Sequence, residues 1–254
     1  MAALSHSSAQ LPHPGWPAPT NRPVIGASAC LLGQRVRYDG DHRYDPYLVE
    51  VLAKEWDLLP ICPEVECGMG VPREPIHLVG DPAAPRLIGR ESGVDHTRRM
   101  QRWVDRRLTE LAAVPLSGFV CKSKSPSSGM RNVKVLLSDG SVQRVGVGLF
   151  ARGLMARFPF LPVIDEVGLA TAAERTRFLR GVHTVHHLRR CTTPAALVAF
   201  LRQRRASLLH EAPHLASRLE ELLASSSFLP WESLWQRSAE LLLATNGTLA
   251  AGPF

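Results

Sequence analysis

The chain has 254 residues and a formal net charge of +7 at pH 7, with 45% hydrophobic and 21% charged residues. This size allows one substantial core with a smaller appendage, and the composition is that of a globular protein. No apolar run reaches the ~20 residues that a membrane-spanning helix needs. Basic residues are spread along the chain without the interleaved aromatic residues of a nucleic-acid-binding surface. We therefore expect no membrane span and no nucleic-acid partner, while the sequence leaves the oligomeric state open.

Residues 1–21 contain prolines, serines and histidines but no charged side chain. They lack the basic start and the continuous apolar run of a secretory signal, so we predict a disordered leader and a cytoplasmic protein. Cysteines in a reducing compartment favour ligand or reactive roles over disulfide bonds.

Strand and helix patterns alternate through the next part of the chain. Short apolar runs predict strands at residues 23–28, 58–62, 76–79, 117–121 and 133–137. Apolar residues at helical spacing predict one helix over about 45–57 and a longer one that begins at Asp95 or Thr97. The buried stripe of the longer helix is expected to be Met100, Trp103, Val104, Leu108 and Leu111. This alternation predicts an α/β fold with a largely parallel, Rossmann-like sheet flanked by helices.

From about residue 170 the sequence predicts helices alone. We expect a small C-terminal all-α appendage over residues 167–254, next to an α/β domain over residues 22–166. Thr193 and Pro194 are typical of a helix start, and Asn246-Gly247 should end the last helix. Three of the histidines in this region lie close together, at positions 183, 186 and 187. No nearby thiol or carboxylate completes a metal site with them, so we interpret them as packed or solvated side chains.

Polar loops follow three of the predicted strands. They are S-A-C-L-L-G at Ser28–Gly33, C-P-E-V-E-C-G-M-G-V-P-R-E-P at Cys62–Pro75, and K-S-K-S-P-S-S-G at Lys122–Gly129. Because the carboxyl ends of parallel strands lie at one edge of a sheet, we expect these loops to share a crevice.

Three of the five cysteines fall in these loops: Cys30, Cys62 and Cys67. Thiolates are soft ligands that suit iron–sulfur clusters and zinc, so the three form a candidate metal site. Cys121 and Cys191 have apolar or helical surroundings, and we interpret both as buried, inert thiols.

Several ordered motifs resemble the family known as DUF523, which includes the thiouracil desulfidases. They are S-A-C-L-L-G-x-x-V-R-Y-D-G, C-P-E-x-x-x-G-x-x-x-P-R, the D-x-T of Asp95–Thr97, and S-P-S-S-G. G-V-G-L-F-A-R and F-P-F-L-P-V are similar to the longer members, which carry a helical DUF1722 tail. The tail of this chain looks like a degraded and truncated version of it.

The resemblance implies a [4Fe-4S] cluster held by three cysteines, with one iron left open. The sulfur of a small thiolated substrate, such as 2-thiouracil, would bind that iron, and water would replace the sulfur in a non-redox, hydrolytic reaction that releases sulfide. Cys30 and Cys62 match the first two ligands, but Ser128 stands at the third. A hydroxyl is a poorer iron ligand than a thiolate, so either the cluster is lost or another thiol replaces it. We expect Cys67 to be the replacement, with Cys121 as the fallback.

The resemblance also assigns other roles within the loops. Glu64 matches the family's acid/base glutamate, and Ser125 matches a serine that relays a proton or holds substrate. Substrate contacts are expected from Ser28, Arg73, Ser127 and Ser128. A structural ion pair is the alternative for Arg73.

Two other hypotheses use the same residues differently. In one, Cys30, Cys62 and Cys67 bind a structural zinc ion together with His77 or water. In the other, the α/β part is a scaffold and the helical tail docks on a protein partner.

Overall fold

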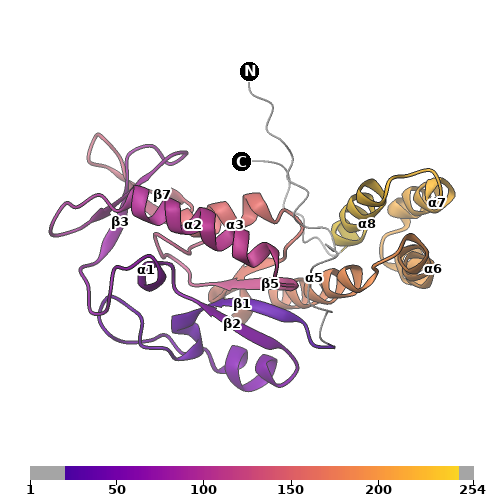
Figure 1. Cartoon of the computed structure of the whole chain (residues 1–254), viewed down its shortest axis with the longest axis horizontal. Coiled ribbons are helices and arrows are strands. Elements are labelled where there is room, and N and C mark those ends of the chain that lie inside the picture. The colour runs from indigo at the N-terminus through magenta and orange to yellow at the C-terminus, as the bar shows by residue number, and fades with distance from the viewer. Residues whose placement is uncertain (1–20, 246–254) are drawn as a thin grey trace.

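The computed structural model describes residues 21–245. Its centre is a parallel sheet with the strand order β2-β1-β5-β8 (Figure 1). The strands are β1 (Val24–Ser28), β2 (Asp57–Ile61), β5 (Leu116–Cys121) and β8 (Val163–Asp165). The predicted parallel sheet with flanking helices is therefore confirmed, although strand β8 was not predicted.

A second sheet, which the sequence did not predict, has the order β4-β3-β6-β7. Its strands are β3 (Ile76–Val79), β4 (Arg86–Gly89), β6 (Val133–Leu136) and β7 (Val142–Gly146). Strands β3 and β6 run parallel, while the pairs β3–β4 and β6–β7 are antiparallel. The predicted turn at Asp139-Gly140 folds β7 back onto β6, and Gly140 has a φ of 82° that favours glycine.

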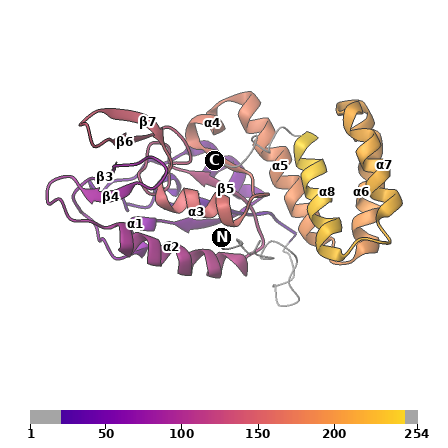
Figure 2. The same cartoon turned by 90° about the horizontal axis from the view of Figure 1, so that it is seen from above.

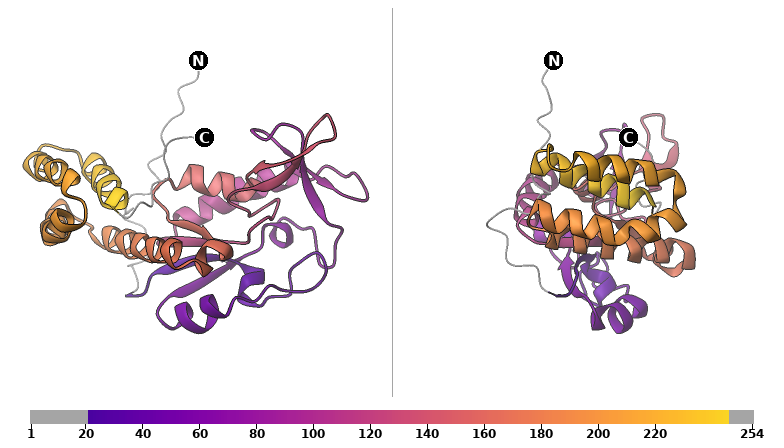
Figure 3. Two further views of the ribbon diagram at one scale, coloured as in Figure 1. Left: turned by 180° about the vertical axis from the view of Figure 1, so that it is seen from behind. Right: turned by 90° about the vertical axis from the view of Figure 1, so that its right-hand side faces the viewer.

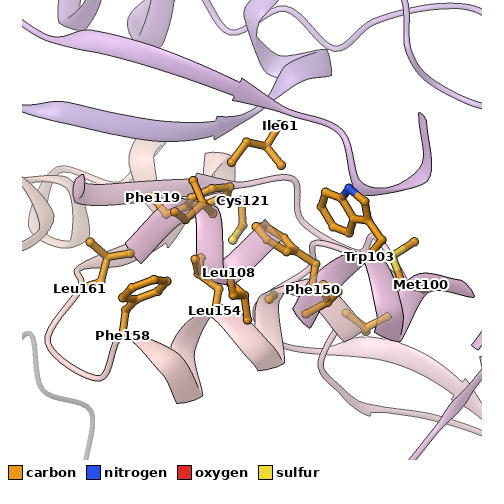
Figure 4. Close-up of a cluster of buried hydrophobic side chains, with 14 of the residues drawn as sticks. Ile61, Met100, Trp103, Leu108, Phe119, Cys121, Phe150, Leu154, Phe158 and Leu161 are labelled. Atoms are coloured by element: carbon orange, nitrogen blue, oxygen red, sulfur yellow. The ribbon is translucent and has the colours of Figure 1, made fainter. Parts of the chain in front are cut away.

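The two faces of strand β5 belong to two different cores. Because successive side chains of a strand point to opposite faces, Phe119 and Cys121 lie in one core and Val120 in the other. Figure 4 shows the first core, in which Phe119 and Cys121 pack near Trp103 and Phe150. Helices α2 (Thr97–Ala112) and α3 (Leu149–Arg157) cover this side. The whole predicted stripe of α2 is buried.

The opposite face is covered by an irregular helical segment and by the first part of α5. The predicted helix over 45–57 is in fact a π-helix, η2 (Tyr47–Val51), followed by a 3-10 helix, η3 (Leu52–Lys54). The helical spacing predicts that Leu48, Val49, Leu52 and Trp56 share one apolar face; Leu48, Leu52 and Trp56 are buried, whereas Val49 is only part-buried. The apolar spacing was therefore recognised correctly, but the hydrogen-bond pattern was not.

The C-terminal part is helical throughout its described residues. It contains α4 (Glu166–Ala170), α5 (Ala172–Arg190), α6 (Pro194–Glu211), η4 (Pro213–Leu215), α7 (Ala216–Ser225) and α8 (Trp231–Thr245). Helices α6, α7 and α8 lie beside α5 at the end of the molecule opposite the second sheet (Figures 2 and 3). Thr193 caps α6 as predicted, since its hydroxyl oxygen accepts a hydrogen bond from the Ala196 amide at 3.2 Å.

Helix α5 joins this region to the parallel sheet. Phe178 and Val182 pack in the sheet core, whereas Leu188 lies in the core of the helical region. The contact with the sheet depends on Gly118 of β5, where a Cβ atom would lie 2.7 Å from a Val182 methyl carbon. The boundary predicted at residues 166 and 167 thus falls at the start of α4, before the helix that the two cores share.

Some predictions concern residues outside this description. The leader over residues 1–21 lies outside it except for Asn21, and Asn246-Gly247 lies outside it as well. Within residues 21–245, no helix is both long and apolar enough to span a membrane.

Candidate active site

The polar loops meet at the carboxyl edge of the parallel sheet. Strand pairing places Ser28 beside Ile61 and Cys121 beside Asp165, so the four strands end close together. The segment after β1 forms a 3-10 helix, η1 (Ala29–Leu32), which carries Cys30. The expected convergence of the loops is explained by the parallel arrangement of their strands.

The loop after β2 begins with one helical turn, α1 (Pro63–Glu66), which the sequence did not predict. Cys62 is the residue that precedes this turn and Cys67 the one that follows it. Proline at the first helical position is well tolerated because its missing N–H would be unpaired there. Glu66 accepts a hydrogen bond from the Cys62 amide at 2.9 Å and lies 3.3 Å from Arg107, so it stabilises the turn.

Glu64 occupies a central position among the predicted site residues. Its side chain is 12% exposed, and Oε1 accepts a 2.7 Å hydrogen bond from the Ser127 hydroxyl. Its other oxygen, Oε2, accepts a 3.5 Å hydrogen bond from the Cys62 thiol and lies 4.0 Å from Nη2 of Arg73. The Cys67 thiol donates to the main-chain oxygen of Glu64 at 3.3 Å. Glu64 therefore connects the loop after β2 to the loop after β5.

Burial and the Glu64 charge act together on the three thiols. They raise the pKa of Cys30 to about 11, of Cys62 to about 12 and of Cys67 to about 11. Burial is the larger cause in each case because it disfavours the charged thiolate. These thiols stay protonated at neutral pH unless a cation binds and displaces their protons.

Residues 122–129, which we call the serine loop, are held by the first turn of α3. The amides of Leu149 and Phe150 donate to the carbonyl oxygens of Pro126 and Ser127, at 3.2 and 2.9 Å. These are helix-terminal N–H groups that have no partner within α3. Close approach requires glycine at position 148, where a Cβ atom would lie 2.5 Å from the Ser127 carbonyl oxygen. The motif G-V-G-L-F thus positions the serine loop.

Within the serine loop, Ser125 and Ser127 form a hydrogen-bonded pair. Their hydroxyl oxygens lie 3.0 Å apart, and the Ser125 hydroxyl oxygen accepts from the amides of Ser127 and Ser128 at 3.3 and 3.1 Å. Since the single Ser127 hydroxyl proton goes to Glu64, the Ser125 hydroxyl must donate to Ser127. The predicted catalytic residues Ser125 and Glu64 are therefore connected through Ser127.

The residues predicted to contact substrate have structural partners. Ser28 is 3% exposed, and its hydroxyl oxygen accepts a 2.9 Å hydrogen bond from the Lys122 amide. Arg73 donates from Nη1 to the carbonyl oxygens of Val36 and Gly70, at 3.0 and 2.9 Å, so it joins two loops in addition to facing Glu64. Ser127 and Ser128 are buried, at 0% and 3% exposure. Their contacts with a substrate remain a prediction.

Sequence reasoning missed a group formed by Lys122, Ser123 and Glu166. Lys122 Nζ lies 2.5 Å from Glu166 Oε1, and Glu166 Oε2 accepts from the Ser123 amide at 2.7 Å. The position of Lys122 directly after a buried strand was a possible signal. The partner could not be recognised because Glu166 follows β8, the strand that was not predicted.

The donor set fits a cluster better than a single ion. Within the described part of the chain, no three His, Cys, Asp or Glu side chains are arranged so that they could hold one metal ion. This disfavours the zinc hypothesis, which needs four donors around one point. Each cysteine ligand of a four-iron cluster binds a different iron, so its thiolates need not meet at one point. The buried thiol of Cys30 and the part-buried thiols of Cys62 and Cys67, at one sheet edge, fit such a cluster in donor type and location.

Comparison with known proteins identifies the family. A sequence model of 2-thiouracil desulfurase matches residues 25–166. The chain belongs to the 2-thiouracil desulfurase family. The predicted resemblance is thereby confirmed, and every predicted site residue lies within the matched residues of this desulfurase domain.

Two relatives show how far the likeness extends. The uncharacterised protein YbbK of Bacillus subtilis (strain 168) is 30% identical over 111 residues, which are 42% of this chain and 73% of YbbK. The solved structure of the [4Fe-4S]-dependent thiouracil desulfidase TudS is 29% identical, with a TM-score of 0.48, and the alignment covers 61% of this chain and 98% of TudS. The family match ends at Glu166, so the DUF1722-like tail over residues 167–254 stays a prediction.

Proposed function

We propose that this protein is a [4Fe-4S]-dependent desulfidase that acts in the reducing cytoplasm on a small thiolated compound such as 2-thiouracil. The reaction would exchange C=S for C=O, with water consumed, sulfide released and no net oxidation or reduction. The observation that carries the proposal is the position of Glu64, whose carboxylate accepts hydrogen bonds from the Cys62 thiol and the Ser127 hydroxyl and whose charge helps to raise the pKa of Cys30, Cys62 and Cys67. Membership of the 2-thiouracil desulfurase family supports the substrate class.

Cys30, Cys62 and Cys67 would hold the cluster. Bound there, it supplies an open, Lewis-acidic iron that accepts the soft substrate sulfur and polarises the C=S bond. Cys67 would stand in for the family cysteine that is Ser128 in this chain. It is part-buried, and it follows the same helical turn that Cys62 precedes, which supports this assignment.

Glu64 would act as the general base. It takes a proton from water as the water oxygen attacks the thiocarbonyl carbon, and the sulfur then leaves as hydrosulfide. The Ser127 hydroxyl holds Oε1 of Glu64, which leaves Oε2 to face the thiol side of the site. The guanidinium of Arg73 lies 4.0 Å from Oε2 and so faces the carboxylate that would act as the base. The Ser125 hydroxyl donates to Ser127 and offers a path along which the abstracted proton can move.

Anaerobic reconstitution with iron and sulfide tests the proposal. We expect four irons and four acid-labile sulfides per chain, a broad absorbance near ~400 nm, and sulfide release from 2-thiouracil. Alanine at Cys30, Cys62 or Cys67 should abolish all three signals. The matched control is Cys191→Ala, because Cys191 is a buried thiol at the end of α5 and should leave cluster content unchanged. Protein that binds zinc without iron, or a cluster-loaded protein that releases no sulfide from thiolated bases, would contradict the proposal.

A further inference from the structure

Both ends of the serine loop are bound to the segment that joins the desulfurase domain to the helical region. At the start, the Glu166 carboxylate accepts from Lys122 Nζ at 2.5 Å, from the Ser123 amide at 2.7 Å and from the Ser123 hydroxyl at 2.6 Å. The side chains of Lys122 and Glu166 are 19% and 20% exposed. This group is therefore a partly buried ion pair with further hydrogen bonds. Such a pair is stronger than an exposed ion pair of the same length.

Just beyond the loop, Arg131 makes the second connection. Its guanidinium donates to both carboxylate oxygens of Asp165 at 3.3 Å and to Glu174 of α5 at 2.7 Å. Asp165 is 4% exposed and also accepts from the Gly168 amide at 2.8 Å, so its own position is fixed by α4. Two neighbouring carboxylates thus act on the two sides of the serine loop: Glu166 holds its first residues, and Asp165 holds Arg131, two residues beyond its end.

The hydrogen bonds of Lys122 indicate that it does not act as a proton donor to substrate. Its ammonium donates to the Ser123 carbonyl oxygen at 3.1 Å, to the Ser123 hydroxyl at 3.2 Å and to Glu166. These three bonds use the three N–H groups of a lysine. Burial alone would raise the pKa of Glu166, but hydrogen bonds from Lys122 and Ser123 hold it below its usual value. Glu166 therefore remains ionised at neutral pH.

The backbone of the loop also requires such support. Lys124 has a φ of 60°, in the left-handed region that side chains other than glycine rarely adopt. Such a conformation persists where the surrounding contacts determine it. Lys124 lies between Ser123, which is held by Glu166, and Ser125, which begins the hydrogen-bond chain to Glu64.

We propose that Lys122 and Glu166 are positioning residues that fix the start of the serine loop, so that Ser127 reaches and orients Glu64. The inference rests on the proposed function, in which Glu64 is the base. Glu166, the last residue of the family match, would thus influence the orientation of Glu64, a carboxylate in the loop that follows β2.

The test uses Lys122→Met, Glu166→Gln and the double variant in the full chain. We expect kcat to fall on the order of ten- to a hundredfold, because small displacements of a catalytic group have effects of that size. KM should change by less than about twofold and iron content should stay the same. The double variant should be no slower than the slower single variant, since the two residues act as one unit. Hydrogen–deuterium exchange in residues 122–129 should become faster, also in cluster-free protein.

Arg205→Met and Glu220→Gln provide the matched control. This pair has the same 2.5 Å nitrogen–oxygen distance but is 55% and 50% exposed and joins α6 to α7. It should change neither kcat nor exchange in the serine loop. The inference is overturned if exchange in the loop is unchanged in Glu166→Gln, if kcat stays within about twofold of wild type, or if activity falls only in proportion to lost iron. Wild-type protein that binds no iron or releases no sulfide would refute the proposed function instead, and the exchange data would still decide whether Glu166 holds the loop.

Discussion

Glu64 connects the Cys62 thiol to the serine loop. Its replacement should therefore slow the reaction without preventing assembly of the cluster. Glu64→Gln keeps the size and a hydrogen-bond acceptor for Ser127 but removes the proposed base. We expect kcat for sulfide release to fall about 10²–10⁴-fold with the iron content unchanged. Ser127→Ala should have a smaller effect, because it removes the group that orients the base. A Glu64→Gln enzyme with wild-type kcat would show that another group activates water.

The identity of the third cluster ligand can be tested by moving the thiol. Cys67→Ala should lose the cluster absorbance and the iron. Ser128→Cys added to Cys67→Ala restores the thiol at the position that the family resemblance implies, and we expect iron content to recover. Ser128 is 3% exposed and serine differs from cysteine by one atom, so the site should accommodate the change. Retention of the full cluster in Cys67→Ala alone would exclude Cys67 as a ligand.

At the level of single residues, the sequence identified groups that belong to motifs but could not identify their hydrogen-bond partners. Cys30, Cys62 and Glu64 could be singled out because thiols and carboxylates are concentrated in loops that follow strands. For Arg73 a structural role was one of the alternatives, but its partners could not be predicted, since they include backbone carbonyls of Val36 and Gly70 that any residue could provide.

Among the elements, helix α3 links the stability of the core to the position of the serine loop. Gly148→Ala would place a Cβ atom 2.4 Å from the Ser127 carbonyl carbon, a backbone atom that cannot move without displacing the loop. We expect a loss of about 1–3 kcal/mol in the free energy of unfolding, measured with urea, and a loss of kcat larger than that destabilisation explains.

Gly153→Ala, in the same helix, is the comparison for this variant. Its new Cβ atom would meet side-chain atoms of Val104 and Leu108 in the core, at 2.8 and 3.1 Å, and not the backbone of the serine loop. Stability should decrease modestly while kcat per bound cluster stays the same. Equal losses of kcat in both glycine variants would show that α3 does not position the serine loop specifically.

Helices and strands whose apolar residues form a regular sequence pattern were predictable. Elements that depend on pairing with a distant part of the chain were not. The stripe of α2 and the fully buried run of β5 carry their burial pattern in the sequence. The single helical turn α1 could not be predicted because it lies among prolines and glycines, which have low helix propensities. The second sheet depends on pairing between β3 and β6, which lie more than fifty residues apart, and a short strand has no local signal of its partner.

At the scale of the whole molecule, the helical region should respond to acid through His186. Burial, together with the charges of His187, Arg190 and His183, lowers the pKa of His186 to about 4. In the unfolded chain the ordinary value is near 6.5, so the unfolded state binds the proton more readily. The free energy of unfolding should therefore fall as the pH decreases from about 6.5 to about 4.

Urea unfolding at several pH values, followed by tryptophan fluorescence, measures this dependence; Trp235 reports on the helical core. His186→Gln should flatten the curve between pH 6.5 and 4, because the neutral side chain takes up no proton. If the variant and the wild type lost stability in parallel, the acid response would come from other groups.

The order of strands in the parallel sheet has a consequence for synthesis on the ribosome. Cys30, Cys62 and Cys67 all emerge before β5, although β1 is completed only when β5 pairs with it on the side opposite β2. A nascent chain therefore presents reactive sulfur to the cell before the serine loop exists to enclose it. The proposed cluster would therefore be assembled only after release of the chain at least as far as β8, and cells short of reductant should accumulate chains oxidised at these early cysteines.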